Sequence, residues 1–251
     1  MKEKSFQDAV GFSVKDTIAL FWLHETSHKP YYSAEIFTKF TESFPGRKVG
    51  YEYVARVAKQ LEGEGLLASK TEGRKLYYQA TDLGLQRLAR YQETYFQRFH
   101  EIVLILDRFY YELTRNGEKP PKPTHSLPEE FRGYFSKLIS VKDIVRYIAF
   151  KLAQTRSSFS MSDVGQQIED LFGWTPSNSY LYTVAWELED KGYLVGSWPD
   201  EKRTKRTLRG TDASNEFFHQ IATDLTDQIR TNRHFLYYML QFFQKIEQQE
   251  S

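Results

Sequence analysis

Leu61-Glu62-Gly63-Glu64-Gly65 and Leu188-Glu189-Asp190-Lys191-Gly192 share the pattern Leu-Glu-x-x-Gly. The offset in residue number between these two segments also relates Val14-Lys15-Asp16 to Val141-Lys142-Asp143. Two further pairs keep the same offset: Tyr53 with Tyr180, and Val57 with Val184. A constant offset across separate segments is hard to obtain by chance. It indicates a duplicated domain.

Each copy has the same predicted order of elements. In the first copy, apolar residues at helical spacing predict helices over residues 13–29, 33–44 and 49–63. Residues 66–69 and 75–79 then predict two strands of a hairpin that turns at Glu72-Gly73. Three helices followed by a hairpin is the order of a winged helix-turn-helix domain.

The second copy repeats this order, and its hairpin is predicted from Tyr193 to Arg209 with a turn near Pro199-Asp200. The expected fold is therefore mainly α, with two tandem winged helix-turn-helix domains, each followed by a long C-terminal helix. The expected boundaries are residues 1–114 for the first domain with its long helix, 115–128 for a proline-rich linker, and 129–251 for the second domain. Half of the eight prolines fall within residues 120–128, which favours an extended linker.

Both long helices carry an apolar stripe. The first stripe contains Leu88, Tyr91, Tyr95, Phe99, Ile102, Leu106, Phe109 and Leu113. The second contains Phe218, Ile221, Leu225, Ile229, Leu236, Met239, Phe243 and Ile246. Helices of this length extend beyond a small domain, so their stripes need a partner helix, by self-association or by intramolecular pairing. Paired aromatic helices can also enclose a flat apolar cavity, so a small aromatic effector is a further candidate partner.

Composition limits the classes of protein to consider. The chain of 251 residues is long enough for two domains that each bury a core. It contains no cysteine, which suits a reducing cytoplasm. We expect no secretory signal and no membrane partner, because no stretch approaches the roughly 20 apolar residues of a membrane span. The net charge is only +1, so nucleic-acid binding requires local basic patches.

The first copy places basic and aromatic residues off the buried side of its third helix and on its hairpin. The candidates for DNA contact are Arg47, Lys48, Tyr51, Arg56, Lys59, Arg74 and Lys75. In a winged helix the third helix enters the major groove, and the hairpin touches backbone phosphate or the minor groove. The alternative is a solvated charged edge that prevents aggregation between sheets.

The second copy offers a different set. Residues 202–209 contain five basic residues in eight, a density suited to phosphate neutralisation. The hairpin candidates are Lys202, Arg203, Lys205 and Arg206, and the candidates on the third helix are Ser177, Asn178 and Tyr182. Asn178 can pair with adenine, whereas Ser177 either holds a phosphate or simply caps the helix. Because Glu187 and Glu189 on this helix repel phosphate, we expect a DNA target with two unlike halves or one dominant half.

One short motif has the pattern of a zinc protease. His24-Glu25-Thr26-Ser27-His28 matches H-E-x-x-H, in which two histidines one turn apart bind zinc beside a glutamate base. It falls at the end of the first predicted helix, and no later segment supplies an obvious third ligand. We interpret it as a polar helix end. The chain also lacks a glycine-rich phosphate loop and a G-x-S-x-G elbow, so we expect no enzyme, no catalytic residue, no cofactor and no metal.

The residues resemble the PadR family of bacterial transcriptional regulators. The segment from Lys75 to Gly84 is similar to the second wing strand and the Thr-x-x-Gly opening of that family's long helix. The segment Ser179-Tyr180-Leu181-Tyr182, with Leu188 to Leu194 after it, is similar to the family's recognition helix. Copy one has Val54-Ala55 in place of the Leu-Tyr pair, and copy two ends its Thr-x-x-Gly motif at Ser214. Family members dimerise through the C-terminal helix, so the resemblance implies a fused dimer.

We therefore expect a cytoplasmic, sequence-specific transcriptional regulator that binds double-stranded DNA, a repressor that acts by occlusion. Two alternatives stay open. A tandem winged-helix scaffold or adaptor between proteins suits the near-neutral net charge. A plasmid replication initiator can also carry two winged domains, and the sequence discriminates poorly between an initiator and a repressor.

Overall fold

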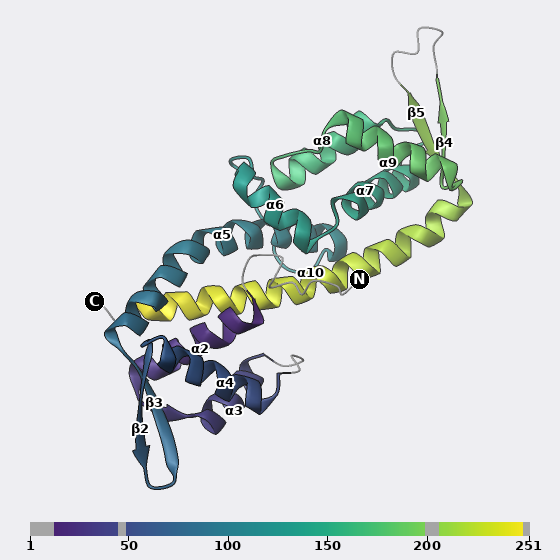
Figure 1. Ribbon diagram of the computed structural model, residues 1–251. Helices are drawn as coiled ribbons and strands as arrows, with labels where there is room; N and C mark the ends of the chain where they lie inside the picture. The colour runs from purple at the N-terminus through teal and green to yellow at the C-terminus, as the bar shows by residue number, and fades with distance from the viewer. Residues whose placement is uncertain (1–12, 45–48, 199–205, 248–251) are drawn as a thin grey trace. The chain divides into compact units, whose positions relative to one another are not determined.

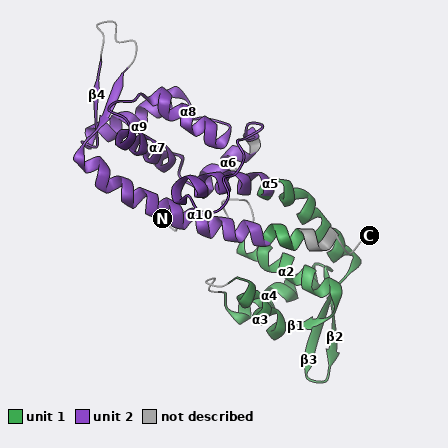
Figure 2. Cartoon of the chain, turned by 180° about the vertical axis from the view of Figure 1, so that it is seen from behind, with its two compact units in different colours: residues 1–99, 239–251 green, residues 100–238 purple. Residues whose placement is uncertain are grey.

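The computed structural model describes residues 13–44, 49–198 and 206–247 (Figure 1). The fold is mainly helical with two small antiparallel sheets, which confirms the predicted mainly α class. Two compact units divide the chain. Unit 1 comprises Met1–Phe99 with Met239–Ser251, and unit 2 comprises His100–Tyr238 (Figure 2). This division falls inside both long helices, whereas the sequence-based boundaries gave each long helix to the copy before it.

The described part of unit 1 has three short helices, a small sheet, the start of one long helix and the end of another. Along the chain, up to the first long helix, these are α2 (Val14–His28), β1 (Tyr31–Tyr32), α3 (Ser33–Ser43), α4 (Tyr51–Gly63), β2 (Leu67–Glu72), β3 (Lys75–Ala80) and α5 (Asp82–Thr114). Helix α2 begins with a capping box, in which the Asp16 N–H donates to Ser13 Oγ (3.1 Å) and the Ser13 N–H donates to Asp16 Oδ2 (3.0 Å). Strand β1 was not predicted; it pairs with β3 and gives the sheet order β1-β3-β2.

Trp22 joins the elements of unit 1. Its side chain is fully buried, and its indole N–H donates to the carbonyl of Val54 on α4 (3.0 Å). Its ring meets Tyr78 of β3 edge to face, with the ring centroids 5.4 Å apart. Because one side chain contacts α4 and β3 from α2, the helices and the hairpin share a single core.

Unit 2 repeats this order after an additional helix. After the end of α5, its elements are α6 (Glu129–Leu138), α7 (Val141–Thr155), α8 (Met161–Phe172), α9 (Asn178–Asp190), β4 (Leu194–Ser197), β5 (Thr207–Gly210) and α10 (Asp212–Glu247), of which the residues from Met239 onward belong to unit 1. Helix α6 was not predicted. It buries Phe131, Phe135 and Leu138, and the Phe135 ring lies 5.7 Å from the Phe172 ring of α8.

The two copies agree in detail. Helices α2 and α4 have the same lengths as α7 and α9, and both pairs keep the offset of the sequence repeat. After the third helix, Gly65 and Gly192 have φ of +74° and +72°, a conformation that favours glycine. The Thr81 hydroxyl then donates to the Gly65 carbonyl (2.7 Å), and the Thr211 hydroxyl donates to the Gly192 carbonyl (2.8 Å). The glycine and the threonine are 16 positions apart in the first copy and 19 in the second, so the second hairpin region is longer.

The long helices α5 and α10 contact each other within both units. In unit 2 the Arg233 guanidinium donates to the Asp107 carboxylate, with Nε and Oδ1 2.6 Å apart. In unit 1 the rings of Phe99 and Phe243 lie 6.3 Å apart. Phe99 and Phe243, one residue from each apolar stripe, therefore contact each other inside the same chain.

The proline-rich segment packs against unit 2. The Arg108 Nε–H donates to the Pro121 carbonyl (2.9 Å), the Ser126 hydroxyl donates to the Gly173 carbonyl (2.5 Å), and Leu127 is buried. These contacts hold the segment along its length instead of leaving it as a free tether. Among the described helices, none is both long and apolar enough to cross a membrane.

Candidate nucleic-acid interface

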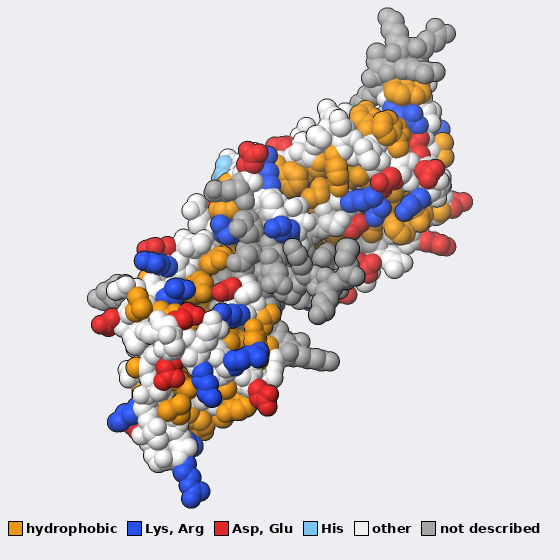
Figure 3. Space-filling view, viewed as in Figure 1, with side chains coloured by type: hydrophobic (Ala, Val, Ile, Leu, Met, Phe, Trp, Pro, Cys, Tyr) orange, Lys and Arg blue, Asp and Glu red, His pale blue; other side chains and the backbone are white. Residues whose placement is uncertain are grey.

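A groove of about 660 Å³ lies on unit 1 between α4, the start of α3 and strand β3. Its lining includes every first-copy candidate for DNA contact that the structure describes: Tyr51, Arg56, Lys59, Arg74 and Lys75. Arg47 and Lys48 lie outside the described residues. Figure 3 shows Lys and Arg side chains with hydrophobic ones between them on the visible face of this unit.

Local sequence explains why these side chains converge. Helix α4 buries Val54, Val57, Ala58 and Leu61, so Arg56 and Lys59 fall on its outer side. In the hairpin, Glu72 pairs with Lys75, and Gly73 between them has φ of +62°. This tight turn requires the conformational freedom of glycine. It places Arg74 and Lys75 at the tip of the hairpin.

Tyrosine rings contact two of the four cations of this groove. Lys75 Nζ lies 3.9 Å from the centre of the Tyr32 ring, and the Arg56 guanidinium lies 4.9 Å from that of Tyr53. Interaction with the Tyr32 hydroxyl raises the pKa of Lys75, which stays charged. Within the described part of the chain, none of the four groove cations forms an ion pair with a carboxylate. Their charge is therefore available to an anion.

Among the groove residues that sequence reasoning missed, Tyr32 and Glu52 have side chains that bear on binding. Tyr32 belongs to the two-residue strand β1, whose register with β3 sets it opposite Tyr77. Such a short strand leaves no periodic signal in the sequence. Glu52 also lines the groove, and its carboxylate can accept a hydrogen bond from a cytosine amino group.

Helix α9 of unit 2 has no basic residue at the two positions that match the α4 cations of unit 1. Thr183 and Trp186 occupy the positions equivalent to Arg56 and Lys59. Trp186 is 58% exposed, and its ring lies 6.4 Å from that of Tyr182. This part of α9 is therefore aromatic and uncharged where α4 is basic.

Glutamates of α9 neutralise the nearby cations of unit 2. Glu189 pairs with Arg206, which also lies over the Trp198 ring, and Glu187 pairs with Lys142 and with Arg146. Lysine hydrogen bonding lowers the pKa of Glu187 and keeps it ionised. Arg206 was a candidate for phosphate contact, but its charge is already partnered. The candidates Lys202, Arg203 and Lys205 lie outside the described residues.

Ser177 caps α9. Its hydroxyl accepts a hydrogen bond from the Tyr180 N–H (3.3 Å), which is the helix-cap alternative of the two interpretations given to it. It also borders a second hollow, of about 630 Å³, together with Ser140 and Lys142. Asn178 is exposed at the first turn of α9. The structure thus brings together the candidates of unit 1, while those of unit 2 are fewer and partly engaged.

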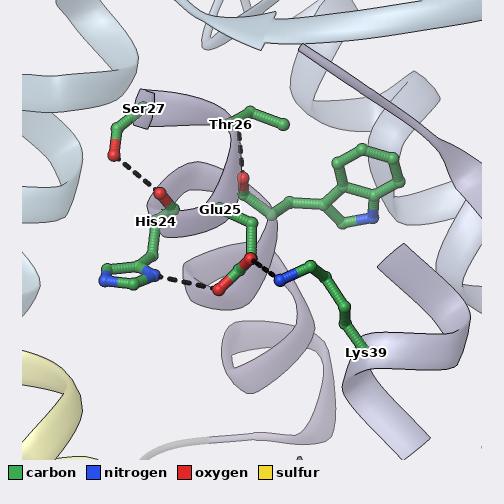
Figure 4. A network of polar contacts seen from close by, with 6 residues as sticks. His24, Glu25, Thr26, Ser27 and Lys39 are labelled. Carbon is green, nitrogen blue, oxygen red and sulfur yellow. Dashed lines mark hydrogen bonds and ion pairs between the residues drawn. The ribbon is translucent and has the colours of Figure 1, made fainter. Parts of the chain in front are cut away.

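The H-E-x-x-H motif forms the end of α2, and Figure 4 shows its first four residues with Lys39. The Glu25 carboxylate lies 3.3 Å from His24 Nδ1 and 2.8 Å from Lys39 Nζ. Burial alone raises the pKa of Glu25, but hydrogen bonds with His24 and Lys39 outweigh it and lower the pKa to about 2. The His24 ring packs on Phe242, with centroids 3.8 Å apart. In the described ranges, no cluster of three or more His, Cys, Asp or Glu side chains could hold a metal ion.

Comparison with known protein families and with curated proteins finds no match. The function is therefore inferred from the chemistry of the groove.

Proposed function

We propose that the chain is a sequence-specific transcriptional regulator of the PadR-like type that binds double-stranded DNA and acts as a repressor. Its two copies would be tandem winged helix-turn-helix domains, a proposal supported by their shared order of three helices and a hairpin. One observation carries the proposal. Four cations without carboxylate partners among the described residues line one concave surface formed by α4 and the hairpin.

The groove suggests a division of labour on DNA. Helix α4 enters the major groove, where Arg56 can donate two hydrogen bonds to guanine. Arg74 and Lys75 at the hairpin tip neutralise backbone phosphates. Lys59, on the same helix as Arg56, can contact either a base or a phosphate. Because none of the four cations pairs with a carboxylate among the described residues, binding does not first have to break such an ion pair.

Unit 2 is proposed to contribute a weaker and different contact. Asn178 and Tyr182 would approach bases near the start of α9, whereas Ser177 remains the helix cap. The negative charge of Glu187 and Glu189 is balanced by neighbouring cations, so this face adds little phosphate attraction. The DNA target therefore has one dominant half. The protein bound there would block access of the transcription machinery.

Selection from a random duplex library tests the proposal. The enriched duplex should bind much more tightly than a scrambled one, as measured by fluorescence anisotropy. The logarithm of affinity should fall with the logarithm of salt concentration, with a slope of about −1.8 if Arg74 and Lys75 meet phosphate and about −2.7 if Lys59 does so as well. A flat salt response, or a library without enrichment, contradicts DNA-binding regulation.

A protein-binding adaptor is the second candidate. The observation that favours it is the aromatic surface of α9, where Trp186 is the most exposed large hydrophobic side chain together with Val195 of β4. Tryptophan and tyrosine are enriched at the centres of protein interfaces. If the selection from the random library enriches no duplex, the result favours this adaptor function.

A further inference from the structure

Strand β4 is the open edge of the unit 2 sheet. On the other edge, β5 is covered by Phe159: the Leu208 N–H donates to the Phe159 carbonyl (2.7 Å), and the Phe159 N–H donates to the Leu208 carbonyl (3.0 Å). Strand β5 therefore has partners on both sides. Strand β4 has only β5 as a strand partner in the described part of the chain.

Hydrogen-bond alternation identifies the open groups of β4. The Thr211 N–H donates to the Tyr193 carbonyl (3.2 Å), which makes this a hydrogen-bonded pair of the ladder. Such pairs alternate with pairs whose backbone groups point away from each other. Gly196 lies opposite Leu208, one of the outward-pointing positions. The N–H and the carbonyl of Gly196 therefore face away from β5, and no described residue bonds to them.

The side chains of β4 do not protect this edge. The strand Leu194–Ser197 contains no charged residue, and Val195 is 58% exposed. Trp198, directly after it, is 42% exposed. Figure 3 shows hydrophobic side chains gathered at the base of this hairpin. Charged residues on edge strands normally prevent two sheets from pairing edge to edge. Strand β4 has no such charge.

The matching strand of unit 1 shows the contrast. Strand β2 carries Lys70 and Glu72, which form an ion pair (3.1 Å) on the exposed edge. Ala68 is the residue of β2 that corresponds to Val195 at the offset of the sequence repeat. One copy therefore has a charged edge strand, and the other has an uncharged one with an exposed β-branched side chain.

We infer that β4 pairs with β4 of a second copy of this chain, in antiparallel orientation about a two-fold axis at Gly196. Antiparallel pairing of a strand with itself is self-complementary, so a single surface supplies both sides of the interface. Because β4 itself carries no charge, its own side chains do not repel those of β4 in a second copy. At the axis two glycines meet, and the side chains nearest to each are those of Glu189 and Arg206 of the same chain, which lie where a Gly196 side chain would be. The result is a four-stranded sheet in the order β5-β4-β4-β5.

Sedimentation equilibrium of the full chain tests this pairing. The average mass should rise towards that of a dimer between low and high micromolar concentration. Val195→Lys should weaken self-association by about tenfold or more, because it sets a lysine from each copy beside the pairing edge. Its side chain is exposed, so the fold should survive. Ala68→Lys is the matched control on β2 and should leave self-association unchanged.

Disulfide trapping tests the register. The chain has no cysteine, so Val195→Cys and Ser197→Cys each introduce a single thiol. The two-fold axis at Gly196 sets residue 195 opposite residue 197 of the second copy, as a pair with Cα atoms about 4.5 Å apart, within disulfide range. A mixture of the two variants should form mixed disulfides faster than either variant alone.

Three results would overturn the inference. The first is a chain that stays monomeric at every concentration. In that case the partner of the β4 edge would be an extended segment of another protein. The second is a dimer that Val195→Lys and Ala68→Lys affect equally, which would place the contact elsewhere. The third is trapping without preference for the mixed pair. Because none of these measurements involves DNA, they fail or succeed independently of the proposed regulator function.

Discussion

Replacing Arg74 and Lys75 together with glutamine removes two of the four unpaired cations of the unit 1 groove. Both side chains lie at the tip of the hairpin, and the Gly73 turn that positions them is untouched. Neither forms an ion pair with a described residue, so no carboxylate is left unpartnered. The expected effect is therefore on DNA affinity and not on folding.

The magnitude follows from counterion release. Each phosphate contact contributes about 0.9 to the slope of the logarithm of affinity against the logarithm of salt concentration. Loss of two contacts should lower the slope by about 1.8. Over a fourfold rise in salt, affinity of the wild type should thus fall about 12-fold further than that of the double variant.

Fluorescence anisotropy with the selected duplex, across a salt series, measures both slopes. Lys70→Gln with Glu72→Gln is the matched control on the same hairpin, because it removes an ion pair (3.1 Å) and leaves the net charge unchanged. Its slope should equal that of the wild type. Equal slopes for the wild type and the Arg74/Lys75 variant would refute the reasoning that these cations meet phosphate.

Three further predictions concern recognition of DNA bases and the stability of the fold. Arg56→Ala should cost about 1 to 3 kcal/mol with the selected duplex and relax specificity at one base pair, measured by repeating the selection. Gly84→Ala should destabilise the fold by about 1 to 3 kcal/mol in urea unfolding, because its Cβ would meet the Leu66 carbonyl. Gly63→Ala, with nothing within 4 Å, is the control and should stabilise slightly. Folding lowers the pKa of Glu25 to about 2, since its hydrogen bonds outweigh the opposing effect of burial. Glu25→Gln should therefore cost about 2 kcal/mol near neutral pH, less than the full pKa shift implies because of solvent screening. That cost should vanish as the pH falls from about 4.5 towards 2, and a cost independent of pH would contradict the assignment.

Repetition made the element order predictable from the sequence. Because Leu61 and Leu188 occupy the same position in each copy, evidence for an element in one copy supported it in the other. The bounds of α4 and α9 follow this offset. Helix α6 was missed, although Phe131, Phe135 and Leu138 have helical spacing, because it follows directly on the proline-rich segment.

The sequence could not predict which basic side chains are paired with a carboxylate and which are not. Arg206 pairs with Glu189 only because the hairpin folds back over α9, which brings together residues 17 positions apart. Lys75 meets Tyr32 only because β1 joins the sheet. A count of basic residues treats Arg206 and Lys75 alike, whereas their surroundings leave one neutralised and the other available.

Completion of unit 1 requires residues that are translated after those of unit 2. Phe242 packs on Phe21 and His24, and Phe243 packs near Phe99, so the end of α10 covers apolar surface of a unit that is otherwise N-terminal. Between Phe99 and Met239 the ribosome adds about 140 residues, which takes about 7 to 28 s at ordinary rates of synthesis. During that interval the nascent unit exposes part of its core. Its folding must therefore finish after unit 2 has been translated, and chaperones that shield apolar surface have this interval in which to act.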